Sequence, residues 1–314
     1  MERDARIYIA GHRGLAGSAI LRRLESLGYK NFILKSHSEL DLTDQKKVDE
    51  FFDINRPDYV FLAAAKVGGI LANSTYPADF IYQNLAIETN VIHSAYKYNV
   101  KKLLFLGSSC IYPKLAPQPL KEEYLLSGYL EPTNQSYAVA KIAGIIMCNS
   151  YNFQYKTNFI SVMPTNLYGP NDNFNLETSH VIPALIRKFV EAKQNGSKTV
   201  TVWGSGNVRR EFLHCDDFAD ACVFLMQNFD AKDLEPFINI GSGVDITIKE
   251  LAYLIAKIVE FNGEIHFDTT KPDGTPQKLL DVSRINKLGF RYKISLEEGL
   301  KSTIKWFIEN KSRL

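Results

Sequence analysis

Residues 7–17, IYIAGHRGLAG, decide the fold of this 314-residue chain. Four apolar residues, which predict a buried strand, run directly into glycines at positions 11, 14 and 17 that open a segment of helical period. Glycines at such a junction permit a tight turn, let backbone N–H groups approach a pyrophosphate, and let the helix pack closely on the strand. The stretch therefore predicts a dinucleotide-binding turn. The alternative is that the glycines serve a tight turn alone.

The same alternation of strand and helix continues beyond this turn. Runs rich in Ile, Val, Leu and Phe predict strands, and longer stretches of helical period follow them. These strands lack a regular apolar–polar alternation, as expected when helices cover both faces of a sheet. The pattern predicts an α/β fold built on a doubly wound parallel Rossmann sheet, with strands at 7–10, 32–34, 59–63, 103–106 and 159–163 and helices at 16–27, 44–54, 77–99 and 137–155.

The regular pattern loosens after Pro164, in loop-like sequence that reaches Ser179. We therefore expect an NADP-binding domain over residues 1–170, with segments near 212–245 returning to it, and a smaller α/β substrate domain over 171–314. Two capping boxes, in which a Thr or Ser precedes a Glu by three residues, predict helices ending near 260 and 309. The other elements expected here are helices at 181–194 and 217–227 and strands at 200–203 and 237–240.

Composition excludes several classes of protein. Lys and Arg number 37 against 35 Asp and Glu, so no overall field attracts the chain to nucleic acid or to a membrane surface. The longest apolar run, near residues 61–72, contains Lys66 and is shorter than the roughly 20 residues of a membrane span. The four cysteines lack CxxC spacing, which predicts a reduced, cytoplasmic protein without a structural metal.

The end of the second strand indicates which dinucleotide is bound. An NAD site places an acid there, for the ribose 2′-hydroxyl, but this chain has Lys35 and His37. Together with Arg13 in the glycine turn, Lys35 favours a 2′-phosphate and therefore NADP(H). Alternatively, Lys35 and His37 are only the solvated end of a strand.

Tyr137 and Lys141 lie four residues apart on a predicted helix and therefore on one face of it. An ammonium beside a phenol, whose ordinary pKa is about 10, favours the phenolate and makes a usable acid or base. Ser108 follows the fourth strand, at the sheet edge where ligands of parallel sheets bind. The three residues therefore predict one site for a substrate carbonyl.

Longer motifs carry a resemblance to a known family. They include GHRGLAGSAI from residue 11, LGSSCIYPKLAPQP from 106, EPTNQSYAVAKIAG from 131, SVMPTNLYGPNDNF from 161 and KPDGTPQKLLDV from 271. These segments resemble the GDP-L-fucose synthases, which are extended short-chain dehydrogenase/reductases. The resemblance covers nearly the whole chain.

The resemblance implies a two-step reaction. GDP-4-dehydro-6-deoxy-D-mannose would be epimerised at C3 and C5, and its C4 ketone then reduced with NADPH to give GDP-L-fucose. Cys110 and His180 would be the epimerisation pair, and Ser108, Tyr137 and Lys141 the reduction triad. An extended backbone would place Ser108 and Cys110 on the same side. A cysteine acts as a base only as the thiolate, so an electropositive surrounding is expected.

The resemblance also implies the contacts of both ligands. Lys188 stands where an arginine is usual for the substrate diphosphate, and His37 stands where an arginine usually meets the 2′-phosphate. The cofactor contacts implied are Gly11, His12, Arg13, Gly14, Leu15, Ala16, Gly17, Lys35, His37, Leu106, Gly107, Ser108, Ser109, Lys141, Pro164, Thr165, Asn166, Leu167 and His180. The GDP-sugar contacts implied are Lys188, Trp203, Arg210, Asp273 and Lys278.

Family members pair through two long helices, so we expect a homodimer that uses the helices at 77–99 and 137–155. Two other functions stay open from the sequence. One is a related 4-epimerase or 4,6-dehydratase of nucleotide sugars, and the other is a non-catalytic dinucleotide sensor.

Overall fold

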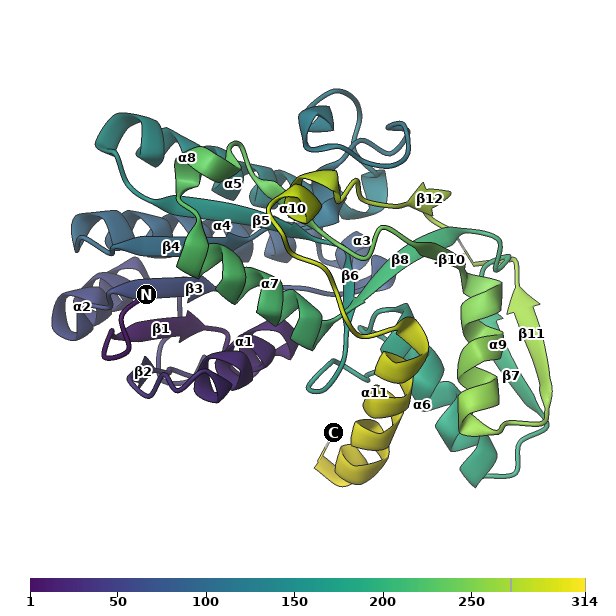
Figure 1. Cartoon of the computed structure of the whole chain (residues 1–314). Coiled ribbons are helices and arrows are strands. Elements are labelled where there is room, and N and C mark those ends of the chain that lie inside the picture. Colours follow the sequence, from purple (N-terminus) through teal and green to yellow (C-terminus); the bar gives the residue numbers. More distant parts are fainter. Residues whose placement is uncertain (272, 314) are drawn as a thin grey trace.

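The central feature is a six-stranded parallel sheet, seen in a computed structural model that describes residues 1–271 and 273–313 (Figure 1). Its strand order is β2-β1-β3-β4-β5-β9, so the chain reverses its direction across the sheet between β1 and β3. The strands are β1 (Ile7–Ala10), β2 (Phe32–Ile33), β3 (Tyr59–Leu62), β4 (Lys102–Leu106), β5 (Phe159–Pro164) and β9 (Ile238–Ile240). The predicted doubly wound parallel sheet is confirmed.

Helices cover both faces of this sheet. In β1, Ile7 and Ile9 pack beneath α1 and α7, while Tyr8 and Ala10 pack on the opposite face, beneath α2, α4 and α5. A strand buried on both faces needs an unbroken apolar run, which is why it lacks the alternation of a surface strand. The helices are α1 (Leu15–Ser26), α2 (Gln45–Asn55), α4 (Pro77–Lys97), α5 (Gln135–Tyr155) and α7 (Cys215–Asn228), with α3 (Ile70–Thr75), α8 (Ala231–Leu234) and α10 (Ser283–Lys287) as shorter pieces.

The rest of the chain forms a second set of layers beyond the carboxyl ends of the strands (Figure 1). It has its own apolar cluster, in which α6, α9 and α11 pack together around Phe189 and Leu251. Its elements are β6 (Asn166–Tyr168), α6 (Val181–Gln194), β7 (Thr199–Trp203), β8 (Arg209–His214), β10 (Asp245–Thr247), α9 (Ile248–Val259), β11 (Glu264–Asp268), β12 (Gln277–Lys278) and α11 (Leu296–Asn310). The division at residue 170 stays a prediction.

One buried residue, Glu211, joins the segments that cross between the two sets of layers. Its carbonyl accepts hydrogen bonds from Thr165 Oγ1 at 3.1 Å and Asn166 Nδ2 at 2.8 Å, next to β5. Its carboxylate accepts from the backbone N–H of Gly243 at 2.7 Å and of Leu280 at 2.8 Å. Burial raises the pKa of this carboxyl, although these hydrogen bonds oppose the rise.

The expected long helices are confirmed, with ends that differ by one or two residues. Both capping boxes form: Thr247 and Ser295 each accept from the backbone N–H of the glutamate three residues on. The expectations missed the strands β6, β8, β10, β11 and β12. Most of these strands are two or three residues long, too short to show a periodicity.

The glycine turn between β1 and α1 is held by close backbone contact. Gly11 has φ +84°, which an L side chain rarely adopts, and Gly17 packs directly against the Gly11 carbonyl. A Cβ on Gly17 would overlap that carbonyl oxygen. The third glycine therefore sets how closely α1 approaches the end of β1.

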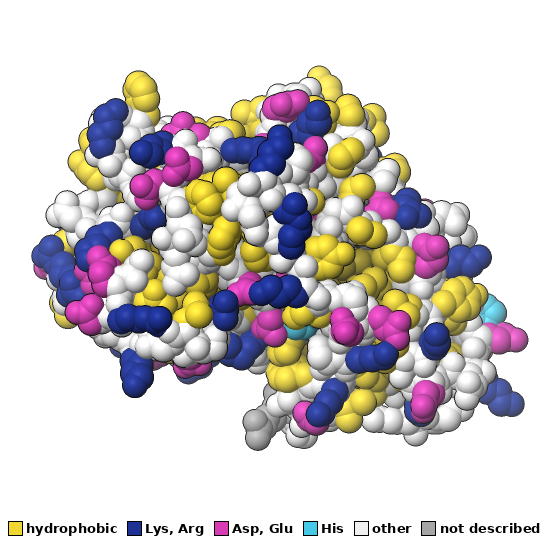
Figure 2. Space-filling view, in the orientation of Figure 1, with side chains coloured by type: hydrophobic (Ala, Val, Ile, Leu, Met, Phe, Trp, Pro, Cys, Tyr) yellow, Lys and Arg dark blue, Asp and Glu magenta, His cyan; other side chains and the backbone are white. Residues whose placement is uncertain are grey.

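Charges of both signs are interspersed over the face shown in Figure 2, as the small net charge of +2 leads one to expect. None of the helices described is long and apolar enough to cross a membrane. Cys110, Cys148, Cys215 and Cys222 are all free thiols.

The close contact at Gly17 gives a prediction about stability. Gly17→Ala should lower the free energy of unfolding of the ligand-free protein by about 1–3 kcal/mol, because the added methyl must displace backbone. Gly14→Ala is the matched control, since a Cβ there meets nothing closer than the Gly11 oxygen at 3.5 Å. Urea unfolding of both variants measures the difference, and equal stabilities would contradict the explanation.

Candidate active site

The carboxyl ends of β1, β4 and β5 meet at one edge of the sheet, and the turn after β1 is open there. Gly14 is the N-cap of α1, and no side chain caps the helix. The N–H groups of the first helical turn are therefore left for an anion, and the helix dipole favours one. The turn fits a dinucleotide pyrophosphate, with Gly11 and Gly17 keeping side chains out of the space.

At the end of β2, basic residues lie beside an acid, Glu39, which comes four residues after Lys35. Lys35 Nζ is 3.9 Å from a carboxylate oxygen of Glu39. Hydrogen bonds from the Ser36 hydroxyl and N–H lower the pKa of Glu39, which keeps it ionised, and Arg13 also lies close enough to affect it. Arg13 and His37 are exposed. The group of basic residues expected to bind the 2′-phosphate therefore includes a carboxylate, that of Glu39.

Ser108 and Tyr137 lie together beyond β4. Ser108 has an extended backbone, with φ −158° and ψ 145°, and both residues are partly exposed. Burial raises the pKa of Tyr137, and the nearby charges of Cys110 and Glu88 raise it further, whereas a hydrogen bond with Ser108 lowers it. Tyr137 therefore keeps its proton and is placed as an acid.

Lys141 lies beneath Tyr137 on α5. Its Nζ donates to the carbonyl of Leu106 at 3.0 Å and lies 5.9 Å from the centre of the Tyr137 ring. Its charge is paired with Glu88 of α4, at 3.0 Å. Glu88 could not be identified from the sequence, because nothing in the pattern around it separates it from an ordinary acid on a helix.

The backbone that leads from Ser108 to Cys110 differs from the one expected. The backbone after Ser108 does not stay extended but turns into a 3₁₀ helix over Ser109–Ile111, and the N–H of Cys110 donates to Ser108 Oγ at 3.3 Å. The expected extended geometry is therefore wrong. The thiol lies 3.3 Å from Asn134 Nδ2 and 3.6 Å from Lys278 Nζ. A cation and an amide donor thus face the sulfur.

His180 is the N-cap of α6. Its side chain keeps an exposed surface, and the protein packed around the ring together with the Lys278 ammonium lowers its pKa. Lys278 is therefore close enough to influence both Cys110 and His180. The imidazole is neutral at neutral pH.

The second set of layers brings two cations next to Cys110. Lys278 of β12 is in register with Arg210 of β8 in a parallel pair, so the two residues are neighbours although they lie 68 positions apart in the sequence. The Arg210 guanidinium donates to the carbonyls of Arg209 and Asp273, at 2.8 Å and 3.3 Å. The Asp273 carboxylate accepts from the N–H of Ser205 at 2.7 Å and so fixes the turn after β7.

Trp203 is an open aromatic surface at the end of β7 and not a core residue, since 49% of it is exposed. Lys188 Nζ lies 5.3 Å from the ring and Lys271 Nζ lies 5.4 Å from it. Lys188 also donates to the carbonyl of Thr201 at 2.9 Å. The tryptophan and two lysines form a surface suited to an aromatic base and an anion. Lys271 was not identified from the sequence.

The expected cofactor segments after β4 and β5 lie at the same edge. A Cβ on Gly107 would overlap the Met163 side chain, so the backbone passes close to β5 there. The polar side chains of Thr165 and Asn166 both bind the carbonyl of Glu211. These side chains are already hydrogen-bonded, so the segment from Pro164 to Leu167 offers mainly backbone groups.

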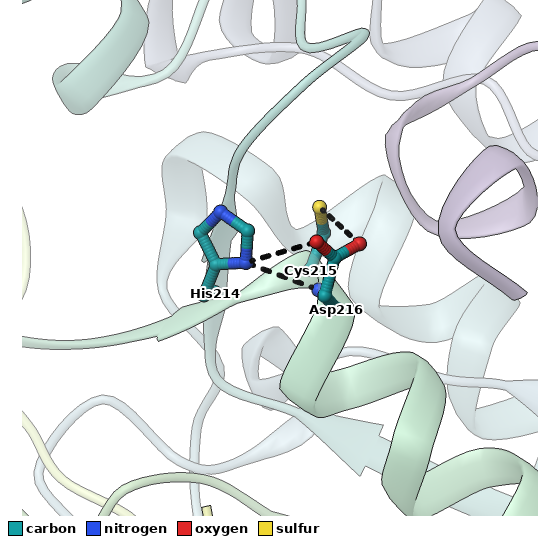
Figure 3. A group of neighbouring side chains, drawn as sticks. All are labelled: His214, Cys215 and Asp216. Carbon is teal, nitrogen blue, oxygen red and sulfur yellow. Dashed lines mark hydrogen bonds and ion pairs between the residues drawn. The ribbon is translucent and has the colours of Figure 1, made fainter. Parts of the chain in front are cut away.

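One further cluster, shown in Figure 3, combines His214, Cys215 and Asp216 at the start of α7. The His214 ring nitrogen Nδ1 accepts from the N–H of Asp216 at 3.3 Å, so it caps the helix. Arg22 donates to Asp216 at 2.6 Å and to the Cys215 sulfur at 3.7 Å, and burial raises the pKa of that thiol. The Arg22 guanidinium already neutralises the Asp216 carboxylate, and we therefore assign no metal to this cluster.

Comparison with known proteins identifies the family. The model of the NAD dependent epimerase/dehydratase family matches residues 7–241. GDP-L-fucose synthase of Escherichia coli K12 is 58% identical, over 98% of this chain and 98% of its own length. GDP-L-fucose synthase 1 of Arabidopsis thaliana is 59% identical, over 98% of this chain and 95% of its own length.

Solved structures agree with these matches. A GDP-6-OMe-4-keto-L-xylo-heptose reductase of Campylobacter jejuni is 44% identical, covers 99% of both chains and superposes with a TM-score of 0.94. A GDP-L-fucose synthetase of Naegleria fowleri bound to NADP is 30% identical, covers 99% of this chain and 96% of its own, and gives a TM-score of 0.91. The chain therefore belongs to the NAD dependent epimerase/dehydratase family and, within it, to the GDP-L-fucose synthases.

Proposed function

We propose that this chain converts GDP-4-dehydro-6-deoxy-D-mannose to GDP-L-fucose with NADPH, by 3,5-epimerisation followed by reduction of the C4 ketone. The observation that carries the proposal is the convergence of Cys110, with a lysine 3.6 Å from its sulfur, and the Ser108–Tyr137 pair in one cleft. An epimerisation base and a reduction acid are both needed, and both lie beside one place for a carbonyl.

In the epimerisation, Cys110 acts as the base. Carbons C3 and C5 flank the ketone, so loss of either proton places negative charge on O4. Ser108 donates to that oxygen and stabilises the charge. The Lys278 ammonium and the Asn134 amide stabilise the thiolate, and the fraction of His180 that carries a proton donates it to the carbon. Solvent then takes the proton from the Cys110 thiol and returns one to the imidazole.

In the reduction, Tyr137 donates its proton to O4 while Ser108 holds the same oxygen. The reduced nicotinamide, when bound, supplies the hydride to C4. The Lys141 ammonium then stabilises the tyrosinate that is left, and the adjacent solvent restores the proton. Lys141 is also placed to bind the nicotinamide ribose.

The ligand contacts follow from the charges around the cleft. Arg13 and Lys35 bind the 2′-phosphate that distinguishes NADPH from NADH. Arg210 and Lys188 bind the GDP diphosphate, and Trp203 offers its ring to the base. Because Glu39 lies beside Lys35, we expect a preference for NADPH over NADH and not a strict requirement.

A second candidate is a GDP-sugar C4 reductase that does not epimerise its substrate. The similarity to a GDP-heptose reductase favours it, while the cation beside Cys110 favours the two-step reaction. A 4-epimerase or 4,6-dehydratase would regenerate its cofactor, so consumption of NADPH in proportion to product excludes both.

We also propose that the chain forms a homodimer through α4 and α5. Along α5, Val139, Ile146 and Phe153 are exposed apolar residues spaced seven apart, and Tyr82 is exposed on the neighbouring α4. A seven-residue spacing places side chains along one side of a helix, which suits packing against another helix.

The roles of Cys110 and Tyr137 separate in an isotope experiment. With the 4-keto sugar in D₂O, Cys110→Ser should slow deuterium incorporation at C3 and C5 by about 100-fold or more, because the base is lost. Tyr137→Phe should leave exchange in place but block NADPH oxidation. Mass spectrometry and absorbance at the NADPH band measure the two steps, and unchanged exchange in the cysteine variant assigns the base elsewhere.

Arg13 should decide the preference between the two dinucleotides. Arg13→Ala should lower kcat/KM with NADPH about tenfold, since one charged contact to phosphate is lost, while kcat/KM with NADH changes little. Initial rates with each cofactor measure this. Equal losses with both cofactors would show that Arg13 does not contact the 2′-phosphate.

The proposed dimer interface is tested by replacing one exposed isoleucine on α5 with lysine. The same replacement on α11 serves as the control. Ile146→Lys should convert the dimer to monomer in analytical ultracentrifugation, because it puts an unpaired charge in the α5 interface. Ile308→Lys, on α11, is the matched control, as Ile308 is exposed to a similar degree. A dimer that persists in the first variant contradicts the proposed interface.

A further inference from the structure

Glu88 and Lys141 form an ion pair in the interior, between α4 and α5. The carboxylate oxygen Oε1 lies 3.0 Å from Nζ, and each side chain is only 2% exposed. Burial raises the pKa of Glu88, and the Lys141 charge opposes that rise. Two charges removed from water are costly, and such a pair is often no more stabilising than apolar residues of the same volume.

The packing around Glu88 leaves space for its carboxylate but does not supply the hydrogen-bond donors that the carboxylate could accept from. Both of its carboxylate oxygens are buried without a hydrogen-bond partner among residues 1–271 and 273–313, although Oε1 forms the ion pair with Lys141. Gly144 of α5 faces it, and a Cβ there would come within 2.9 Å of Oε2 and overlap the Phe105 ring. A helix position without a side chain thus allows α5 to approach the carboxylate closely. Stability alone does not account for an acid here.

The pair connects to the reacting groups through Lys141. The same ammonium donates to the Leu106 carbonyl at 3.0 Å, at the end of β4, and lies beneath Tyr137. The lysine is therefore held at two points, one on the sheet and one on α4. A side chain with four rotatable bonds becomes fixed under the phenol.

The other charged and titratable groups nearby are few. The charge of Glu88, on α4, raises the pKa of Tyr137 and of Cys148, which both lie on α5. The charge of Cys110, in the 3₁₀ turn, also raises the pKa of Tyr137. On β4, Lys141 meets the Phe105 ring and the Leu106 carbonyl. Helix α3 carries no charged residue. Helix α2 pairs with α4 through Asp49 and Lys97, which is about two and a half turns beyond Glu88.

We propose that Glu88 is a positioning residue for the reduction: its carboxylate holds the Lys141 ammonium in place and offsets its charge, so that Tyr137 keeps its proton until the ketone is reduced. The inference rests on the function proposed above. A lysine alone favours the phenolate, which a reductase cannot use as an acid. The Glu88 carboxylate offsets the lysine charge and so favours the protonated phenol of Tyr137.

The proton and electron balance of the step is simple. A hydride adds to C4 with its electron pair, the C=O π electrons move to O4, and the O–H bond of Tyr137 breaks to give its proton to O4. The dinucleotide is oxidised, the ketone becomes an alcohol, and the tyrosinate regains a proton from water. Glu88 exchanges neither proton nor electrons.

The test replaces the charge but keeps the shape. Glu88→Gln should lower the pKa of Tyr137 by about one unit or more, because a neighbouring negative charge is lost while the lysine remains. The difference in phenolate absorbance between Glu88→Gln and Glu88→Gln/Tyr137→Phe, compared with the difference between wild type and Tyr137→Phe and followed against pH in the ligand-free proteins, measures this shift without any turnover. With substrate, the high-pH decline of kcat should move to lower pH, and the KM for the sugar should stay unchanged.

Two control variants separate positioning from stability. Glu122→Gln also removes a buried carboxylate, one that lies 3.6 Å from Arg284, and it should leave the pH dependence of reduction unchanged. Glu88→Asp keeps the charge and should retain the wild-type pH dependence even where it is less stable. If Glu88→Gln alters only stability, with the phenolate titration and the pH profile both unmoved, the proposal is overturned. If the titration shifts but the wild-type protein reduces no 4-keto sugar, the proposed function fails, while the effect of Glu88 on the protonation of Tyr137 stands.

Discussion

The structure depends on one constraint. In a parallel sheet that is buried on both faces, the carboxyl ends of all the strands lie at the same edge. Because helices cover the sheet on either side, the backbone leaves β1, β4 and β5 toward a single cleft. The glycine turn, Ser108 and the Pro164 segment meet there although about 150 residues separate the first from the last. The position of the site follows from the topology before any side chain is considered.

The second set of layers adds charge to this cleft. Two short parallel strands, β8 and β12, place Arg210 and Lys278 side by side, opposite the loop that carries Cys110. The first sheet and its helices thus supply Ser108, Cys110 and Tyr137, and the later part of the chain adds His180 and the cations Arg210 and Lys278. Neither part contains the cleft by itself.

Much of the fold could be predicted from the sequence, because its signals are local. The glycine turn, the apolar runs and the capping boxes each lie within about a dozen residues, and the helices they predict are present. The candidate site was predicted less completely. The pairing of residues 277–278 with 209–210 joins two short segments that have no period. The 3₁₀ turn at Ser109 depends on a hydrogen bond to Ser108, and Glu88 looks like any helical acid until α5 is packed against it.

Glu211 has a consequence for how the two parts of the chain are held together. Its backbone and side chain join the Thr165–Asn166 segment, β8, the Gly243 turn and the chain at Leu280 to one another. Rotating the second set of layers against the parallel sheet would break these hydrogen bonds together, around a residue that is fully buried. The distance between Cys110 and the cations opposite it is therefore set by a shared scaffold and does not depend on the surface loops.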